Sequence, residues 1–216
     1  MKKQTILTLL ISLALNIYFL SVNTVAQSDT TTVKRLMEEG ISRMENNELR
    51  KAIELFDQGR EMLHKIAVEK SEKNQDIIRS NQLTRDAEKL IRQNNLEQAL
   101  GLLNEAIELN DQNIEALKFR GSIRLILEQQ KERPKDRDFI GLINDYTNAI
   151  SITDRKINES PRNSQESKEL EREKAKILIN RAYVKMQANR NAAFKSAIED
   201  YTEALRNDGE NWDGYL

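Results

Sequence analysis

The sequence predicts an all-α protein built from repeated helical hairpins, and its composition and one recurring apolar pattern support that prediction. The 216 residues include only 7 Gly and 2 Pro, with 5% aromatic and 32% charged residues. Few helix breakers together with many Lys, Glu, Arg, Leu and Ala residues favour long helices over a sheet sandwich or barrel. The low aromatic content favours a thin, extended core over a single dense one.

The recurring pattern is a small or apolar residue, a large apolar residue four positions on, and a small residue three positions further. Spacings of four and three place all three side chains on one face of a helix. Because the small residues let a neighbouring helix approach closely, we expect each copy, here called a packing triplet, to join two helices. The packing triplets are Ala52–Phe56–Gly59, Ala99–Leu103–Ala106, Leu142–Tyr146–Ala149 and Ala197–Tyr201–Ala204.

The first two packing triplets belong to regular hairpins. A small residue, Gly40 or Ala87, precedes each of them by twelve positions. Polar turns lie in between, at 45–48 and 93–95, where asparagine tolerates the backbone conformations that end a helix. The sequence therefore predicts a helix, a short turn and a second helix in each case.

The other two hairpins are longer, and polar stretches lie between the units. The spacing of small residues predicts insertions at 129–138, around Pro134, and near 189–191. Residues 67–81 are expected to lengthen the adjoining helices. Residues 156–174 are rich in Ser, Asn, Glu and Arg, and they are expected to form a loop plus a solvated helix.

The second hairpin resembles the tetratricopeptide repeat (TPR) family. The match departs from the family pattern at Asp111, where the family usually has proline. The alternative to a repeat fold is an irregular helical bundle in which the spacing of the packing triplets arises by chance. The resemblance implies a right-handed α-solenoid of about four antiparallel hairpins, with the start of a fifth at 212–216. The residues that match the family pattern are Leu90, Asn94, Leu96, Ala99, Leu103, Ala106 and Leu109. The expected units are 33–66, 80–113, 114–156 and 175–211, within a domain spanning 27–216.

The N-terminus has the pattern of an export signal. Lys2 and Lys3 precede a largely apolar stretch over 6–22, and Thr24 and Ala26 fit the small-x-small rule for cleavage after Ala26. This predicts a signal peptide over 1–26 and a periplasmic or secreted protein. The alternative is an uncleaved anchor in the inner membrane formed by 6–22, which is short for a span.

The resemblance also implies a concave groove lined by the first helix of each hairpin. Methionine side chains there suit an adaptable surface for an apolar peptide or helix, although they can equally pack between hairpins. Apolar residues on the first hairpin argue against a clamp for a carboxylate tail. The expected groove residues are Met37, Ile41, Met44, Thr84, Glu88, Ile91, Lys118, Ser122, Leu125, Ile179, Tyr183 and Met186.

Composition and motifs argue against several other functions. The net charge is −1, which leaves no basic excess for nucleic acid. The chain has no cysteine and only one histidine, His64, so a zinc site or a catalytic triad is not expected. No phosphate loop or nucleophile elbow is present. We expect no cofactor, no metal and no enzymatic activity.

Three functions remain open from the sequence. The leading one is an exported interaction module that binds a segment of another envelope protein, through the groove or through an uncapped C-terminal end. The second is a structural part of a larger assembly or chain, with 139–216 as its contact edge. The third is an accessory domain of an enzyme-containing protein. The identity of the partner cannot be read from the groove residues.

Overall fold

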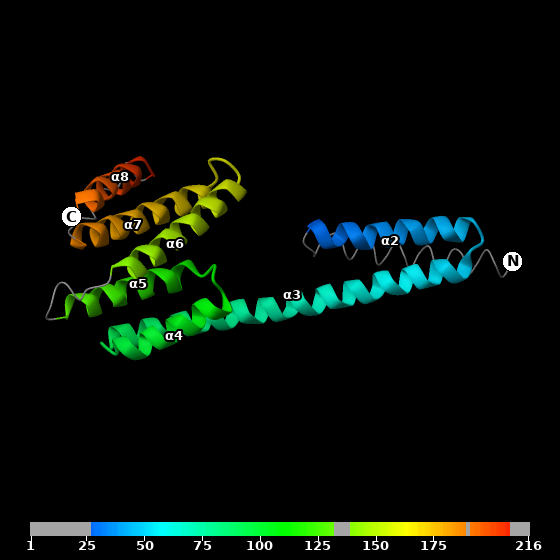
Figure 1. Ribbon diagram of the computed structural model, residues 1–216, viewed down its shortest axis with the longest axis horizontal. Helices are drawn as coiled ribbons and strands as arrows, with labels where there is room; N and C mark the ends of the chain where they lie inside the picture. The colour runs from blue at the N-terminus through cyan, green and yellow to red at the C-terminus, as the bar shows by residue number, and fades with distance from the viewer. Residues whose placement is uncertain (1–26, 132–138, 189–190, 208–216) are drawn as a thin grey trace. The chain divides into compact units, whose positions relative to one another are not determined.

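The computed structural model describes residues 27–131, 139–188 and 191–207, and this part of the chain is helical throughout apart from short connections. The all-α prediction is confirmed. The predicted signal peptide, most of the insertion at 129–138 and the start of a fifth repeat lie outside the described residues. The helices are α2 (Gln27–Glu45), α3 (Leu49–Arg92), α4 (Leu96–Leu109), α5 (Ile114–Gln129), α6 (Ile140–Glu159), α7 (Gln165–Gln187) and α8 (Asn191–Asn207) (Figure 1).

The chain divides into two compact units, 1–75 and 76–216. In the first unit, α2 and the N-terminal part of α3 form a hairpin with a close helix contact. A Cβ atom on Gly40 would lie 2.5 Å from Cε1 of Phe56, and one on Gly59 would lie 2.7 Å from Cε of Met37. Glycine on each helix therefore lets a large side chain of the other helix lie against its backbone.

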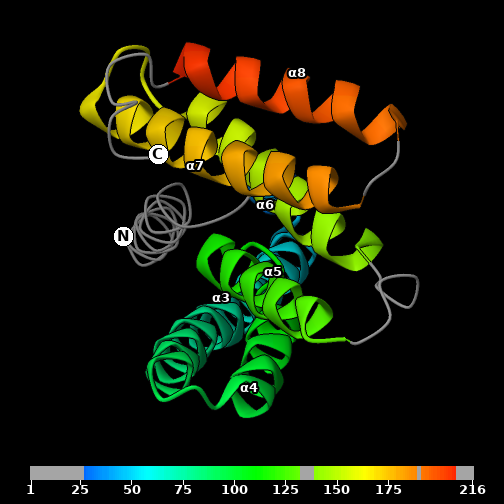
Figure 2. The same ribbon diagram turned by 90° about the vertical axis from the view of Figure 1, so that its left-hand side faces the viewer.

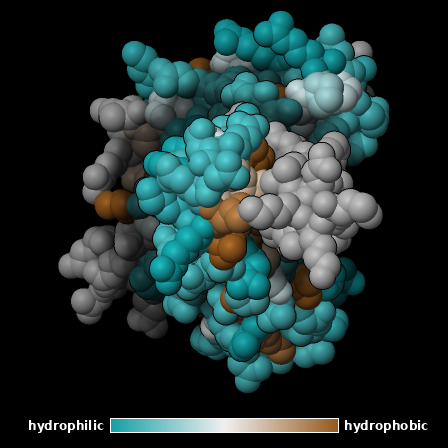
Figure 3. Space-filling model, turned by 90° about the vertical axis from the view of Figure 1, so that its right-hand side faces the viewer, coloured by the Kyte–Doolittle hydropathy of each residue, from teal (hydrophilic) through white to brown (hydrophobic). Residues whose placement is uncertain are grey.

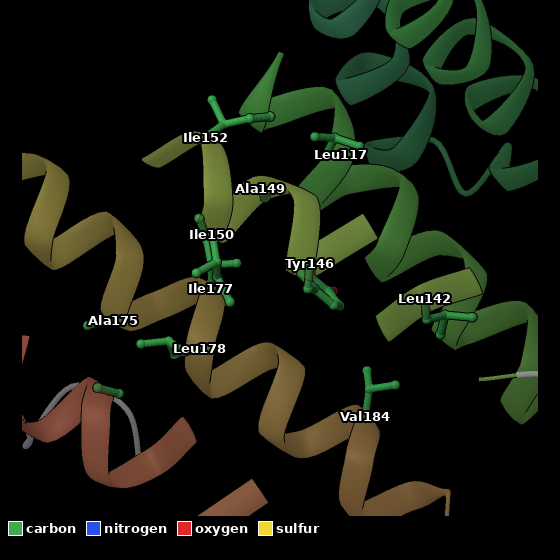
Figure 4. Close-up of a cluster of buried hydrophobic side chains, with 11 residues drawn as sticks. Leu117, Leu142, Tyr146, Ala149, Ile150, Ile152, Ala175, Ile177, Leu178 and Val184 are labelled. Carbon is green, nitrogen blue, oxygen red and sulfur yellow. The ribbon is translucent and has the colours of Figure 1, made fainter. Parts of the chain in front are cut away.

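The second unit contains the C-terminal part of α3 and the helices α4 to α8. From α4 onward each helix contacts the next one in chain order, so the helices form a row that ends with α8 (Figures 1 and 2). One apolar cluster joins α3, α4 and α5 around Leu103 and Ile123. A second cluster joins α5 to α8 around Tyr146, Ile177 and Leu178 (Figure 4). The core is thus a thin apolar layer that continues from one helix pair to the next.

The packing triplets lie where the sequence places them, on the buried faces of the second helices. Ten of their twelve residues are buried, and only Phe56 and Tyr201 are partly exposed. In the third hairpin, Tyr146 is 1% exposed, and a Cβ atom on Gly121 would lie 2.9 Å from its Cζ. The prediction that these residues join helices is confirmed.

Both predicted asparagine turns are also confirmed. Asn47 and Asn94 have φ values of 58° and 61°, in the left-handed region. At the second turn, the Asn95 N–H donates to the Leu90 carbonyl at 2.9 Å and the Asn94 N–H donates to the Ile91 carbonyl at 2.9 Å. This pair of bonds is the Schellman motif, which satisfies carbonyls at the end of a helix.

The left-handed conformation makes position 94 sensitive to side-chain type. Replacing Asn94 with alanine is expected to lower the free energy of unfolding by about 1 kcal/mol, because a left-handed backbone is costly for most L-residues. Replacing Asn94 with glycine keeps the conformation accessible and is the matched control. Urea denaturation measures both effects. Equal midpoints for the two variants would contradict this prediction.

Both polar stretches between hairpins contain the helix that the sequence predicts. The segment 67–81 is entirely helical and makes α3 a single helix of 44 residues. Within 156–174, α6 continues to Glu159 and α7 begins at Gln165, so the predicted loop plus helix is found. The Ser164 side chain caps α7 by accepting a hydrogen bond from the Ser167 N–H at 3.0 Å. This local cap sets the residue at which the helix begins.

Charged residues cover much of the helix surfaces. On the face drawn in Figure 3, which shows the end where α2 turns into α3, hydrophilic side chains dominate and apolar ones form small, scattered patches. Many of the charges pair along a helix, as Lys34 does with Glu38 and Arg92 with Glu88. Exposed pairs of this kind contribute little to stability.

Candidate functional site

A buried carboxylate holds the third hairpin together. Asp145 on α6 is 3% exposed and receives two hydrogen bonds from Arg120 on α5, from Nε at 3.1 Å and from Nη2 at 2.6 Å. Arg124, one turn further along α5, donates to the same carboxylate at 2.8 Å. These three residues are called the first ion-pair triad. Two-point contact between a guanidinium and a carboxylate fixes both position and orientation.

The fourth hairpin repeats this arrangement with different residues. Asp200 on α8 is 4% exposed and receives hydrogen bonds from Arg181 on α7, from Nε at 3.0 Å and from Nη2 at 2.6 Å. Lys185 donates to the same carboxylate at 2.7 Å. These residues form the second ion-pair triad. In both hairpins a basic pair, four residues apart on the first helix, holds an aspartate of the second helix.

One arginine of each triad, Arg120 or Arg181, also contacts the preceding hairpin. Arg120 donates from Nη1 to Oδ1 of Asn104 on α4 at 3.1 Å. Arg181 donates from Nη1 to Oγ1 of Thr147 on α6 at 3.2 Å. Asn104 and Thr147 occupy the same place in the repeat, one residue after the large residue of a packing triplet. The same guanidinium therefore joins its own hairpin and the one before it.

The triads were not predicted from the sequence, although a signal for them is present. Each aspartate directly precedes the tyrosine of a packing triplet, as Asp145 precedes Tyr146. The arginine that binds the aspartate through two nitrogens directly precedes the small residue of the first helix, as Arg120 precedes Gly121 and Arg181 precedes Ala182. Reading these two positions together would have indicated a paired contact.

The twelve predicted groove residues fall into different environments. Met37, Met44 and Thr84 are 4%, 5% and 6% exposed. These three side chains pack within the protein, because Met37 lies against Gly59 and the Thr84 hydroxyl accepts a hydrogen bond from Nδ2 of Asn113 at 3.0 Å. They are therefore corrected to structural positions. The partly buried residues of the set are Ile41, Glu88, Ile91, Lys118, Ser122, Leu125 and Ile179.

A polar network around Asn113 fixes the start of α5 against α3. Nδ2 of Asn113 donates to Oγ of Ser80 at 2.8 Å as well as to Thr84, and its Oδ1 accepts from the Ala116 N–H at 3.0 Å. Ser80 in turn donates to the Ala106 carbonyl at 2.6 Å. Buried polar side chains in folded proteins are generally hydrogen-bonded. Here their hydrogen bonds connect α3, α4 and α5.

The first helices of the third and fourth hairpins, α5 and α7, contact each other. Lys118 on α5 forms an ion pair with Glu173 on α7 and another with Glu115. Burial by itself lowers the pKa of Lys118, but hydrogen bonds to these two carboxylates outweigh it, so the pKa is raised above the usual value. Nε2 of Gln129 also lies 3.5 Å from the Tyr183 hydroxyl. Two of the helices expected to line the groove are therefore neighbours.

Tyr183 and Met186 are the members of the predicted set that are most open to solvent. They are 42% and 41% exposed, on the same helix and three residues apart. Spacing of three places both side chains on one face of α7. An aromatic ring beside a flexible thioether can contact an apolar partner of varied shape.

Tyr146 connects the interior of the third hairpin to the α5 surface. Its hydroxyl lies 3.1 Å from Oγ of Ser122, a predicted groove residue. Burial raises the pKa of the Tyr146 phenol above its usual value, and this effect exceeds the opposing effect of the Ser122 hydrogen bond. The folded protein therefore favours the neutral phenol.

This raised pKa predicts a loss of stability in alkaline solution. Stability from the neutral phenol is complete below the unfolded-state pKa of about 10. It falls as the pH rises from there through the higher folded-state pKa, because only the unfolded chain ionises readily. We expect Tyr146→Phe to lower the free energy of unfolding by about 1 kcal/mol at neutral pH, because the hydrogen bond is lost. In the variant, the free energy of unfolding is expected to fall less steeply as the pH rises. Urea denaturation across the alkaline range measures the slope. Parallel profiles for the two proteins would contradict the prediction.

Apolar side chains are exposed on α8. Phe194, Ile198 and Leu205 are 43%, 64% and 45% exposed. They lie on the last helix of the row, which contacts α7 (Figure 2). Spacings of four and seven place them on one helix face.

Within the described ranges, the structure has no cluster of residues suited to hold a metal ion, and no helix there is long and apolar enough to cross a membrane. Residues 6–22, the alternative anchor, lie outside those ranges. No family model matches the chain, and no curated protein matches it in sequence.

Proposed function

We propose that the chain is an exported, TPR-like scaffold that binds a segment of another protein of the bacterial cell envelope and has no catalytic role. The observation that carries the proposal is the repeated arginine contact, in which Arg120 and Arg181 each join their own hairpin to the preceding one. A contact that recurs at equivalent positions gives successive hairpins a constant relation, which is the basis of a solenoid. The right-handed superhelix is part of this proposal.

The proposed binding surface lies on the first helices, α5 and α7. These helices are neighbours through Lys118 and Glu173, and α7 exposes Tyr183 and Met186. A partner with apolar side chains, either an extended peptide or an amphipathic helix, fits such a surface. Ile179 and Leu125 pack partly into the core, so they would support the surface more than contact the partner.

The proposed location rests on the sequence of the first 26 residues. A basic start, an apolar stretch and a small-x-small site are the features of a secretory signal. Intact-mass measurement of the mature protein tests this part. A mass that retains residues 1–26 would favour the anchored alternative.

Site-specific photocrosslinking in the envelope tests partner binding. A photoreactive residue at Tyr183 or Met186 is expected to capture one defined protein. The same residue at Asn148, which is exposed on the second helix α6, is the matched control and is expected to capture little. An absence of adducts at positions 183 and 186, or equal capture at position 148, would contradict partner binding through α5 and α7.

The second candidate is a structural role within a larger multi-repeat or enzyme-containing protein or assembly. The exposed apolar side chains on α8 favour it, because monomers rarely leave an apolar helix face open without a partner. Under this candidate, contacts would form through α8 and not through α5 and α7.

A further inference from the structure

A second three-residue pattern lies on the outer face of each second helix of the second unit. It consists of an apolar residue, a polar residue four positions on, and an apolar residue three positions further, which we call the outer triplet. Each outer triplet has the same place relative to the packing triplet of its helix. The outer triplets are Leu100–Asn104–Ile107 on α4, Ile143–Thr147–Ile150 on α6 and Ile198–Thr202–Leu205 on α8.

The apolar residues of the first two outer triplets pack in core clusters that include the next helix along the chain. Leu100 and Ile107 on α4 are partly buried against the core, Ile143 on α6 likewise, and Ile150 is 7% exposed. By contrast, Ile198 and Leu205 on α8 are 64% and 45% exposed. Among the described residues, the outer triplets of α4 and α6 are thus packed against other helices, whereas the outer triplet of α8 is exposed.

Thr202, the polar residue of the outer triplet on α8, can accept a hydrogen bond from a partner. On α6, Thr147 donates its hydroxyl proton to the Ile143 carbonyl at 2.7 Å and accepts a hydrogen bond from Arg181. On α8, Thr202 donates to the Ile198 carbonyl at the same distance of 2.7 Å. Because the hydroxyl proton is used in the same way, the Thr202 oxygen keeps the acceptor capacity that Thr147 uses toward Arg181. The described residues supply Thr202 with no donor comparable to Arg181.

The helices that cover the first two outer triplets share a pattern of their own. In α5 it is Leu117, Arg120 and Gly121, and in α7 it is Leu178, Arg181 and Ala182. The leucine is 1% or less exposed in both helices. Leucine adds apolar contact, the small residue allows close approach, and the arginine reaches the polar residue of the outer triplet.

We propose that the outer face of α8 binds an amphipathic helix of a partner protein with the pattern Leu-x-x-Arg-small. The arginine of that helix donates to Thr202, and its apolar side chains cover Ile198 and Leu205. This inference rests on the proposed role as an interaction scaffold and assigns the chemistry of a partner at α8.

The probe for this surface is a synthetic peptide with the sequence of 171–187, taken from α7. Its fluorescence anisotropy is measured with the full chain, and one peptide is expected to bind per protein. Ile198→Ser is expected to weaken binding about tenfold, the effect of losing one buried apolar side chain. Ile78→Ser is the matched control, because Ile78 is 66% exposed on α3, and it is expected to leave binding unchanged.

A second arm tests the arginine. A peptide carrying Arg181→Met is expected to bind about tenfold more weakly, as removal of a charged hydrogen-bond donor predicts. Against Thr202→Val protein, the two peptides are expected to bind alike. Equal binding of both peptides to the unmodified protein would overturn the role of Thr202.

Three other results would overturn the proposal. They are an absence of peptide binding to the full chain, binding only to a chain that ends at Asn207, and self-association of the full chain that Ile198→Ser abolishes. The second result would mean that the chain's own end covers α8, and the third that a second copy does. Crosslinking from Tyr183 is measured separately, so failure here is distinguishable from failure of groove binding.

Discussion

Asp145→Asn is expected to lower the free energy of unfolding of the second unit by about 3 kcal/mol, near the lower limit for breaking a buried ion pair. The side chain of Asp145 is 4% exposed, whereas those of Arg120 and Arg124 are 16% and 32% exposed. Neutralising the aspartate leaves two cations facing each other in a partly dry site. Because the arginines keep some contact with water, we expect less than the full cost of an isolated buried charge. Urea denaturation followed by circular dichroism measures the loss.

The matched control is the same substitution at an exposed pair. Asp86 pairs with Lys89 at 2.7 Å, with side chains 40% and 68% exposed, so Asp86→Asn is expected to change the free energy of unfolding much less than Asp145→Asn does. A double-mutant cycle with Arg120→Met and Asp145→Asn isolates the coupling between the two residues. Equal losses at positions 86 and 145 would show that the triad contributes no more than a surface pair.

The free energy of unfolding of the Gly121→Ala variant is expected to be about 1–3 kcal/mol lower than that of the Gly101→Ala variant, the range for overpacking a close contact. Both glycines lie inside helices, so alanine gains about 1 kcal/mol of helix propensity at each. At Gly101 nothing lies within 4 Å of the new Cβ atom, so this gain remains. At Gly121 the Cβ atom would lie 2.9 Å from the ring of Tyr146, which is 1% exposed and has little space to move.

A compensating change tests whether Tyr146 is the cause. The second hairpin has Ala87 and Leu103 in the places of Gly121 and Tyr146, and both are fully buried in one core cluster. The double variant Gly121→Ala with Tyr146→Leu copies that pair. The loss of stability caused by Gly121→Ala should therefore be smaller in a protein that already carries Tyr146→Leu than in the unmodified protein. Thermal melts of the four proteins measure this. An unchanged cost would place the strain elsewhere.

Much of the helical framework could be predicted from the sequence because its signals are local. The packing triplets are spaced at helical intervals, and Asn47 and Asn94 supply the left-handed residues that end α2 and α3. The residue at which α7 begins could not be predicted, because the polar composition of 156–174 does not mark the boundary between loop and helix. There the Ser164 cap and the contacts of Lys174 with Asp154 and Glu203 stabilise a helix.

The candidate surfaces were harder to predict than the helices. Helical spacing alone does not distinguish a residue that faces a groove from one that faces a neighbouring helix. Met37 and Met44 were expected in the groove and are buried, whereas Tyr183 and Met186 from the same set are exposed. The difference depends on which helix lies alongside, and this is a tertiary property.

The sequence by itself determined that the chain is helical and that its second helices pack through small–large–small triplets, since both follow from periodicity within one helix. Only the tertiary structure decided which charges are buried together. Asp145 and Arg120 are 25 residues apart in the chain, and they meet because α5 and α6 form an antiparallel pair. Likewise, the open outer triplet of α8 became recognisable only when its two counterparts were found covered by helices. Its exposure depends on neighbours in space, which one-dimensional spacing does not specify.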